Sequence, residues 1–221
     1  MDMQQELEAR FADRSAAGRR LAARLEHLRD QRPVILGLPR GGVPIAYEVA
    51  QALGAPLDVI VVRKLGVPWL PELAMGAIGE DGSRVVDRAL LRHERIADDL
   101  LAEVEERESA ELRRRAQIYR AGRDPVSIDG RLVVLIDDGI ATGATARAAC
   151  LVVKQRAAAR VVLATPVLPP DLISPLGRVA DELVWLCAPD PMVAVGNWYE
   201  DFEQLTDAEV VDLLARAGQS R

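Results

Sequence analysis

The sequence predicts an α/β fold with a mainly parallel sheet and helices on both faces. Short apolar runs without polar alternation are separated by segments with helical spacing, a pattern typical of doubly covered strands joined by crossover helices. The polar, glycine-containing segments follow the apolar runs, so they would gather at the C-terminal edge of the sheet, where such folds bind ligands. The 221 residues suit a single domain, 1–221, with a core over about 32–187.

The apolar runs are interpreted as five core strands at residues 34–38, 57–62, 131–137, 161–166 and 183–186. A hairpin is expected where Glu-Asp-Gly-Ser separates residues 74–78 from 84–86. Residues 65–73 hold two prolines and a glycine, which favour a long loop.

Helical spacing is found at residues 5–29, at 43–53, from 87 to about 121, and after the strand at 131–137 up to about 158. The segment from Asp87 exceeds the usual length of a helix, so it is expected to project from the core or to be broken into two. It forms a long helical insertion, on which the run Arg113-Arg114-Arg115 is interpreted as a solvated face.

Composition excludes some classes of protein. Lys and Arg total 28 against 34 Asp and Glu, a formal net charge of −6, which disfavours a dedicated nucleic-acid binder. The apolar runs are too short to span a membrane, and Asp2, Glu6 and Glu8 do not fit a signal peptide. A cytoplasmic protein with no membrane or nucleic-acid partner is expected.

The most informative segment runs from Val133 to Thr145, Val-Val-Leu-Ile-Asp-Asp-Gly-Ile-Ala-Thr-Gly-Ala-Thr. Asp137 and Asp138 follow the strand, and their carboxylates suit paired ribose hydroxyls or a hydrated divalent cation. The next residues would present backbone N–H groups, hydroxyls and a helix N-terminus to one phosphate. Those residues are Ala141, Thr142, Gly143, Ala144 and Thr145. A sugar diol beside a phosphate describes a ribose 5-phosphate.

This segment resembles the phosphoribosyl pyrophosphate binding motif of the type I phosphoribosyltransferases, in which four apolar residues precede two acids and an Ala-Thr-Gly-x-Thr loop. The resemblance implies that Asp137 and Asp138 hold the ribose and that residues 141–145 hold the 5-phosphate. Gly139 departs from the motif, which usually has a branched apolar residue there. The bland alternative is a solvated Asp-Asp turn followed by a helix cap.

Two further segments resemble the donor site of the same family. Leu38-Pro39-Arg40-Gly41-Gly42 is similar to the pyrophosphate loop, since glycines allow close backbone approach and Arg40 can bind phosphate oxygens. Arg63 and Lys64 end the second predicted strand, where the family usually has a basic residue facing pyrophosphate. A structural turn and ordinary flanking charges are the respective alternatives.

Residues 65–76 correspond to the family's mobile loop, which closes over the ribose and excludes water. Pro68, Trp69 and Pro71 are unusual in a mobile loop, so the extent of its movement stays open.

A hood over the site is expected from residues of about 1–30 and 188–221. The segment Trp198-Tyr199-Glu200-Asp201-Phe202 concentrates aromatic side chains, and stacking by Trp198 and Tyr199 would suit a planar acceptor ring. The alternative is that these rings pin the tail to the core. The early Leu-Pro-Arg-Gly-Gly and late Trp-Tyr-x-x-Phe are similar to a group of uncharacterised bacterial phosphoribosyltransferase-domain proteins, which does not disclose an acceptor.

The resemblance implies a Mg²⁺-dependent transfer of ribose 5-phosphate from phosphoribosyl pyrophosphate (PRPP) to a ring nitrogen. Arg40, Arg63 and Lys64, with Mg²⁺, would neutralise the departing pyrophosphate. The metal would be held mainly by the substrate, with Asp137 or Asp138 contributing through water. A non-catalytic sensor of PRPP or a nucleotide is the main alternative, and an accessory domain of a hydrolase is another. A homodimer is compatible with the long helix and the hairpin.

Overall fold

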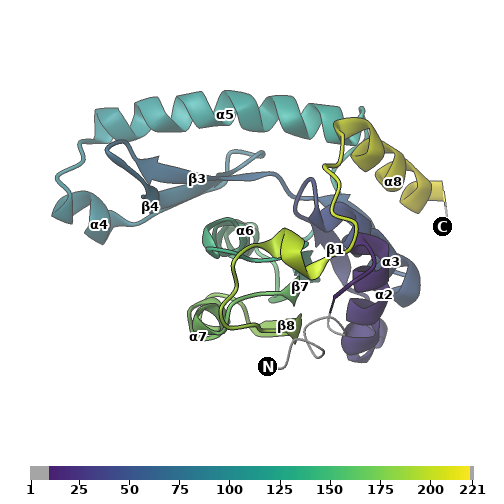
Figure 1. Cartoon of the computed structure of the whole chain (residues 1–221). Coiled ribbons are helices and arrows are strands. Elements are labelled where there is room, and N and C mark those ends of the chain that lie inside the picture. The colour runs from purple at the N-terminus through teal and green to yellow at the C-terminus, as the bar shows by residue number, and fades with distance from the viewer. Residues whose placement is uncertain (1–9, 220–221) are drawn as a thin grey trace.

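The computed structural model describes residues 10–219, which form two β-sheets with helices around them (Figure 1). The larger sheet has five strands in the order β2-β1-β6-β7-β8, and all its neighbouring strands are parallel. Its strands are β1 (Val34–Gly37), β2 (Leu57–Val59), β6 (Leu132–Ile136), β7 (Arg160–Val167) and β8 (Glu182–Cys187). The predicted parallel α/β architecture is confirmed.

Both faces of this sheet are buried, because apolar side chains alternate between two cores. Ile35 and Val134 belong to one core, while their neighbours Val34 and Val133 belong to the other. The first core is covered by α2 (Arg14–Leu25) and α3 (Gly42–Leu53), and the second by α6 (Ala144–Gln155) and α7 (Ile173–Gly177). Short 3-10 helices lie at Glu26–Gln31, Pro170–Leu172 and Val195–Trp198.

The first described helix is shorter than the segment predicted at residues 5–29. It begins at Arg14 because Asp13 caps it, with Oδ1 accepting a 2.6 Å hydrogen bond from the Ala16 amide. After Leu25 the chain continues as the 3-10 helix. Residues 5–9 of that prediction lie outside the described residues.

The second sheet corrects two predictions. It consists of β3 (Val62–Val67), β4 (Leu70–Gly79) and β5 (Arg84–Val86), all antiparallel. The strand predicted at 57–62 ends at Val59, so Arg63 and Lys64 lie within β3 and not at the end of a core strand. Residues 65–76, expected as a loop, pair instead across β3 and β4 with register shifts at Gly66, because ladder hydrogen bonds satisfy this backbone.

The hairpin predicted for 74–78 and 84–86 is confirmed by the pairing of β4 with β5. The long helical segment that follows is broken into two, α4 (Arg88–His93) and α5 (Asp98–Arg120). The break contains Arg95 in the left-handed region, with φ of 55°. Helix α5 then runs above β3 across the top of the molecule (Figure 1).

A buried ion cluster ties the C-terminal end of α5 to the rest of the fold. Arg120 contacts the carboxylates of Asp58 and Glu80 and donates a 3.0 Å hydrogen bond to the Val59 carbonyl. All three charged side chains are at most 10% exposed. Since buried charges require partners, this cluster sets where α5 lies relative to both sheets.

A segment near the start of the described chain pairs with a segment that precedes α8, beside the large sheet. Phe11 and Tyr199 form a parallel bridge, with a 2.8 Å bond from the Phe11 amide to the Trp198 carbonyl. The final helix, α8 (Asp207–Gln219), packs on α3 and α5 (Figure 1). Within residues 10–219, no helix has the length and apolar character needed to cross a membrane.

Candidate functional site

The acid pair lies at the C-terminal end of β6, the central strand of the large sheet. Ile136 is the last residue of the strand, so Asp137 and Asp138 emerge at the edge where parallel sheets bind ligands. The Asp137 amide still bonds to the Ala164 carbonyl on β7 at 3.3 Å, and its Oδ1 accepts a 3.0 Å bond from the Asp138 amide. Strand pairing therefore fixes the backbone of both acids.

Two residues from the ends of the chain hold Asp138 from outside the motif. Arg14 Nε donates a 2.9 Å hydrogen bond to Asp138 Oδ2, and the Tyr199 hydroxyl donates a 2.5 Å bond to the Asp138 carbonyl. The Arg14 guanidinium also lies 3.9 Å from the centre of the Phe202 ring. Neither role was predicted, because both partners lie far from the motif in sequence.

In the unliganded protein, burial and mutual repulsion disfavour the ionised forms of Asp137 and Asp138. Burial raises the pKa of Asp137 above its usual value, and the neighbouring Asp138 carboxylate raises it further. Burial also raises the pKa of Asp138, although the Arg14 hydrogen bond and charge oppose the shift. Hydrogen-bond donors or a cation placed against these oxygens would relieve this unfavourable arrangement.

The Leu-Pro-Arg-Gly-Gly segment connects β1 to α3 and lies directly on the acid pair. A Cβ atom at Gly41 would be 1.8 Å from Asp138 Oδ2, and one at Gly42 would be 2.3 Å from the Ile136 carbonyl oxygen. Only glycine therefore fits at both positions. The Pro39–Arg40 peptide bond is cis, and the Arg40 side chain is 38% exposed with its guanidinium 3.9 Å from Asp207.

The segment Ala141–Thr145 forms the turn into α6, as the sequence predicts. Gly143 is the N-cap of the helix and has a φ of 74°, a conformation that side chains rarely adopt. Thr142 and Thr145 are exposed. Because the first amides of a helix have no partner within it, this turn presents donors suited to an anion.

Gly139, the departure from the motif, has a packing explanation. A Cβ atom there would lie 2.3 Å from Val195 Cγ1 and 3.0 Å from Val167 Cγ1. Val195 belongs to the 3-10 helix near the C-terminus. The space that a branched side chain would need is thus filled by the tail of the chain.

The basic residues of β3 line a cavity next to these loops. This cavity of about 460 Å³ is bounded by Leu38 and Pro39, by Arg63 and Lys64, and by Thr145. The structure therefore brings Leu38 and Pro39 of the predicted pyrophosphate loop, the basic strand and the start of α6 around one space, although Arg40, Gly41 and Gly42 do not line it and Arg63 and Lys64 reach it from the second sheet.

Trp198 and Tyr199 are buried, at 7% and 4% exposed. The Tyr199 ring packs between Phe11 and Phe202, with ring centres 5.4 and 4.9 Å away. Burial raises the pKa of the Tyr199 hydroxyl, and the nearby Asp138 carboxylate adds to the shift. In this structure both rings pack the C-terminal segment against the core. They do not present the open stacking surface that one reading of the sequence suggested.

Among the described residues, a cation at the acid pair would find only part of its ligands. Within the described residues 10–219, no group of three or more His, Cys, Asp or Glu side chains converges on one point. Asp137 and Asp138 supply the oxygen ligands that Mg²⁺ prefers, but too few to complete its shell. The residues fit a Mg²⁺ ion that substrate oxygens and water also bind.

Comparison with known proteins places these features in a family. The model of the phosphoribosyl transferase domain matches residues 11–65 and 59–176. A protein named "Putative phosphoribosyl transferase Rv0571c", from Mycobacterium tuberculosis H37Rv, is 52% identical over 207 residues, which are 94% of this chain and 47% of that protein. The same figures hold for "Putative phosphoribosyl transferase MT0597" from strain CDC 1551. The chain thus spans about half the length of these curated relatives.

A solved structure agrees over nearly the whole chain. The crystal structure of TT1426 from Thermus thermophilus is 46% identical, with a TM-score of 0.88, and the match covers 94% of this chain and 98% of that one.

Proposed function

Because the chain belongs to the type I phosphoribosyltransferase family, we propose that it transfers ribose 5-phosphate from PRPP to a ring nitrogen of a base-like acceptor and releases pyrophosphate. The observation that carries this proposal is the half-buried acid pair, Asp137 and Asp138, next to the anion-binding turn at the start of α6. A diol and a phosphate that lie side by side on one sugar match this arrangement.

In the proposed donor complex, Asp137 and Asp138 accept hydrogen bonds from the ribose hydroxyls. These bonds and the nearby positive charge of the reacting sugar relieve the repulsion that raises the pKa values of the pair. The amides and hydroxyls of residues 141–145 hold the 5-phosphate. Asp138 stays in position because Arg14 and Tyr199 bind its side chain and its carbonyl.

The leaving group is proposed to bind on the other side, against the loop of Pro39, Arg40, Gly41 and Gly42. Gly41 and Gly42 allow this backbone to lie on the acid pair, and Arg40, Arg63 and Lys64 supply positive charge. Mg²⁺, bound through substrate oxygens and through water on Asp137 or Asp138, would offset part of the negative charge of the pyrophosphate. Positioning and electrostatic stabilisation then lower the barrier, because the transition state resembles an oxocarbenium ion.

The test is Mg²⁺-dependent release of pyrophosphate from PRPP across a panel of purines, pyrimidines and related rings. Release that depends on one ring supports the transferase. Tight PRPP binding with no turnover on any ring would instead favour a non-catalytic sensor of PRPP or a nucleotide.

The ribose assignment has a separate test. Asp138→Asn is expected to weaken PRPP binding severely, by at least ~10-fold for the loss of one charged hydrogen bond, and to leave the fold intact by circular dichroism. Asp212→Asn is the control, because Asp212 lies on the exposed face of α8 and pairs with Arg216 one turn away. Unchanged PRPP affinity in Asp138→Asn would remove the assignment.

A further inference from the structure

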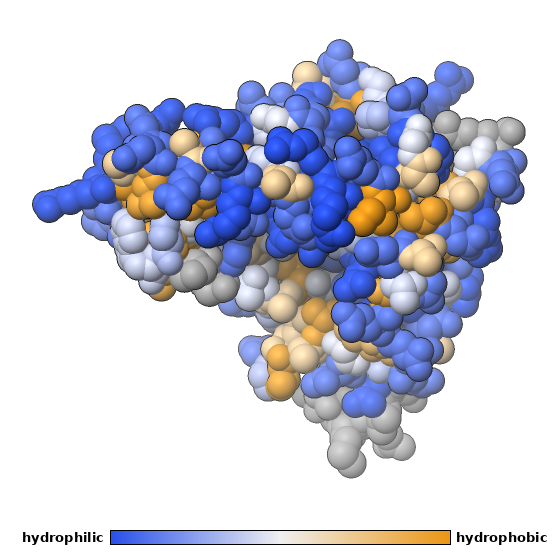
Figure 2. All heavy atoms as spheres, turned by 90° about the horizontal axis from the view of Figure 1, so that it is seen from above, coloured by the Kyte–Doolittle hydropathy of each residue, from blue (hydrophilic) through white to orange (hydrophobic). Residues whose placement is uncertain are grey.

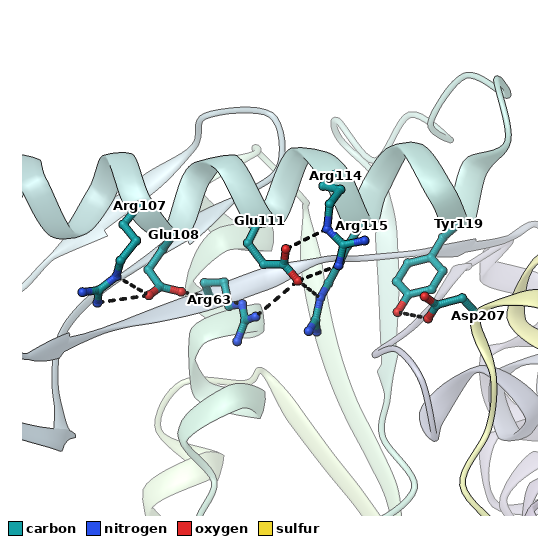
Figure 3. Close-up of polar contacts among 8 residues, drawn as sticks. All are labelled: Arg63, Arg107, Glu108, Glu111, Arg114, Arg115, Tyr119 and Asp207. Atoms are coloured by element: carbon teal, nitrogen blue, oxygen red, sulfur yellow. Dashed lines mark hydrogen bonds and ion pairs between the residues drawn. The ribbon is translucent and has the colours of Figure 1, made fainter.

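The cavity beside the proposed donor site extends beyond what the donor uses. Strand β3 contributes Arg63 and Lys64 to its lining, and α5 contributes Arg107, Glu108 and Arg115. Figure 3 shows Arg63 directly beside the carboxylates of α5. Helix α5 belongs to the long insertion and contributes nothing to the proposed binding of PRPP. The outer face of the molecule, seen from above where α5 lies, is mainly hydrophilic with some apolar patches (Figure 2).

Positive charge exceeds negative charge in this cavity. Arg63, Lys64, Arg107 and Arg115 line it, against one lining carboxylate, Glu108. A second carboxylate, Glu111, contacts Arg115 Nε at 2.6 Å, Arg114 Nε at 2.8 Å and an Arg63 nitrogen at 4.0 Å (Figure 3). The arginine hydrogen bonds lower the pKa of Glu111 to about 2, so it stays ionised and its single charge is divided among three guanidinium groups.

The carboxylates orient the arginines but do not occupy all of their N–H donors. Arg63 Nε lies 3.8 Å from Glu108 Oε2, too far for a hydrogen bond, and this buried Nε atom has no hydrogen-bond partner within the described part of the chain. Arg107 and Arg115 remain 74% and 40% exposed. Guanidinium groups that retain unused donors and lie close together on β3 and α5 suit the planar oxygens of a carboxylate or the oxygens of a phosphate.

The spacing along α5 argues that the donor alone does not account for this charge. Arg107 and Arg115 are eight residues apart, which corresponds to about 12 Å along a helix. The pyrophosphate of PRPP is assigned to the near end, where Pro39, Lys64 and Thr145 meet the cavity. From Arg115, which lies near Tyr119 and the pyrophosphate loop, to Arg107, two turns earlier on the helix, α5 continues the positive surface toward a second anionic group.

We infer that the acceptor carries an anionic substituent, a carboxylate or a phosphate, which Arg115 and Arg107 of the inserted helix bind. The inference rests on the proposed function, since it assigns the substrate class of the same site. It also gives the insertion a role: α5 supplies the specificity that the buried rings of Trp198 and Tyr199 do not offer. Tyr119, whose hydroxyl donates a 3.0 Å bond to Asp207, closes the cavity near Arg40.

The experiment compares pairs of related rings, one member of each pair with an anionic substituent and the other with a neutral one. Pyridine-3-carboxylate is paired with pyridine-3-carboxamide, and pyridin-3-yl phosphate with 3-hydroxypyridine, so the two arms distinguish a carboxylate from a phosphate. Binding to the full chain is measured by calorimetry with Mg²⁺ and inorganic pyrophosphate present to fill the leaving-group site. We expect the anionic member of at least one pair to bind ~10-fold more tightly or better, the ratio that one additional charged hydrogen bond provides.

Variants then assign the preference to the cavity. Arg115→Gln and the double variant Arg107→Gln/Arg115→Gln are expected to reduce the preference to less than about threefold with PRPP affinity unchanged. Arg114→Gln is the matched control, because Arg114 lies on the same helix and bonds the same Glu111 but is not part of the cavity lining. It is expected to keep the preference, and thermal unfolding checks that all three variants are folded.

The outcomes separate this inference from the proposed function. PRPP binding without preference for either anionic ring, or a preference that Arg107→Gln/Arg115→Gln retains, would overturn the inference alone. Loss of PRPP affinity in Arg115→Gln would also overturn it, because the cavity would then hold the donor. A wild-type protein that prefers anionic rings but binds no PRPP would contradict the proposed function and leave the anion site standing.

Discussion

Arg14 Nε donates a 2.9 Å hydrogen bond to Asp138 Oδ2 across 124 positions of sequence, so the first described helix holds the second acid of the pair that follows β6. Both side chains are mostly buried, at 12% and 16% exposed. The same guanidinium donates a 2.9 Å bond to the Glu203 carbonyl. One arginine thereby joins the two ends of the chain to the C-terminal edge of the sheet.

We predict that Arg14→Gln weakens both the fold and the donor site. Asp138 would lose its buried ionic partner, a change that costs about 3 kcal/mol in such settings. Its already raised pKa would rise further, because the Arg14 hydrogen bond and charge that oppose the effect of burial would be gone. Denaturant unfolding and PRPP titration measure the two effects. Arg19→Gln is the control, since Arg19 lies on the same helix in an exposed 3.5 Å pair with Glu48. Equal effects of the two variants would show that the Arg14 contact is unimportant.

We predict that Asp137→Asn stabilises the unliganded protein. The folded pKa of Asp137 is raised above its unfolded value of ~3.9. The folded state therefore binds more protons than the unfolded state and loses stability as pH rises from the unfolded pKa to the folded pKa. Asparagine can still accept the 3.0 Å bond from the Asp138 amide. The variant should therefore melt at about the wild-type temperature at pH 4 and ~3 °C or more above it at pH 8.

Thermal melts across this pH range test the prediction, and PRPP binding should fall in the same variant. A stability difference that stays constant from pH 4 to pH 8 would show that Asp137 does not titrate in this way. The expected pattern is a carboxylate kept for its ligand at a cost to the free protein.

We predict that Gly41→Ala abolishes PRPP binding. The new Cβ would lie 1.8 Å from Asp138 Oδ2, so either the loop or the acid must move. Gly177→Ala is the control, because a Cβ there meets nothing within 4 Å and helix propensity favours alanine by about 0.5–1 kcal/mol. Calorimetric titration with PRPP checks both variants. Wild-type affinity in Gly41→Ala would show that the loop does not need to lie on the acid pair.

The tail aromatics are predicted to act through packing and through Asp138. Trp198→Ala should cost about 3 kcal/mol, as for other buried aromatic truncations, without changing which acceptor is used. Tyr199→Phe keeps the ring contacts but removes the 2.5 Å bond to the Asp138 carbonyl, so it should lower PRPP affinity. Unfolding and acceptor competition are the measurements. If Trp198→Ala changed the choice of acceptor but not the stability, the result would support the acceptor-stacking role that the sequence suggests for Trp198.

The sequence predicted most of the fold because its signals are local. The runs at β1, β6, β7 and β8 are contiguous and apolar, and the hairpin at 74–86 has an explicit turn. The prediction was wrong at residues 57–76, where one apolar run supplies strands to two sheets. Periodicity alone does not reveal that the chain leaves one sheet for another after Val59, because both environments bury the same kinds of side chain.

The motif from Val133 to Thr145, and with it the family, was determined by the sequence alone, since its strand, acids and turn are consecutive and carry their own chemistry. Only the tertiary structure decided that Arg14 and Tyr199 hold Asp138, that Gly139 makes room for Val195, and that Arg107 and Arg115 line one cavity with Arg63. Each of these contacts joins segments far apart in the chain. Their formation depends on how helices and sheets pack, which no local pattern of residues specifies.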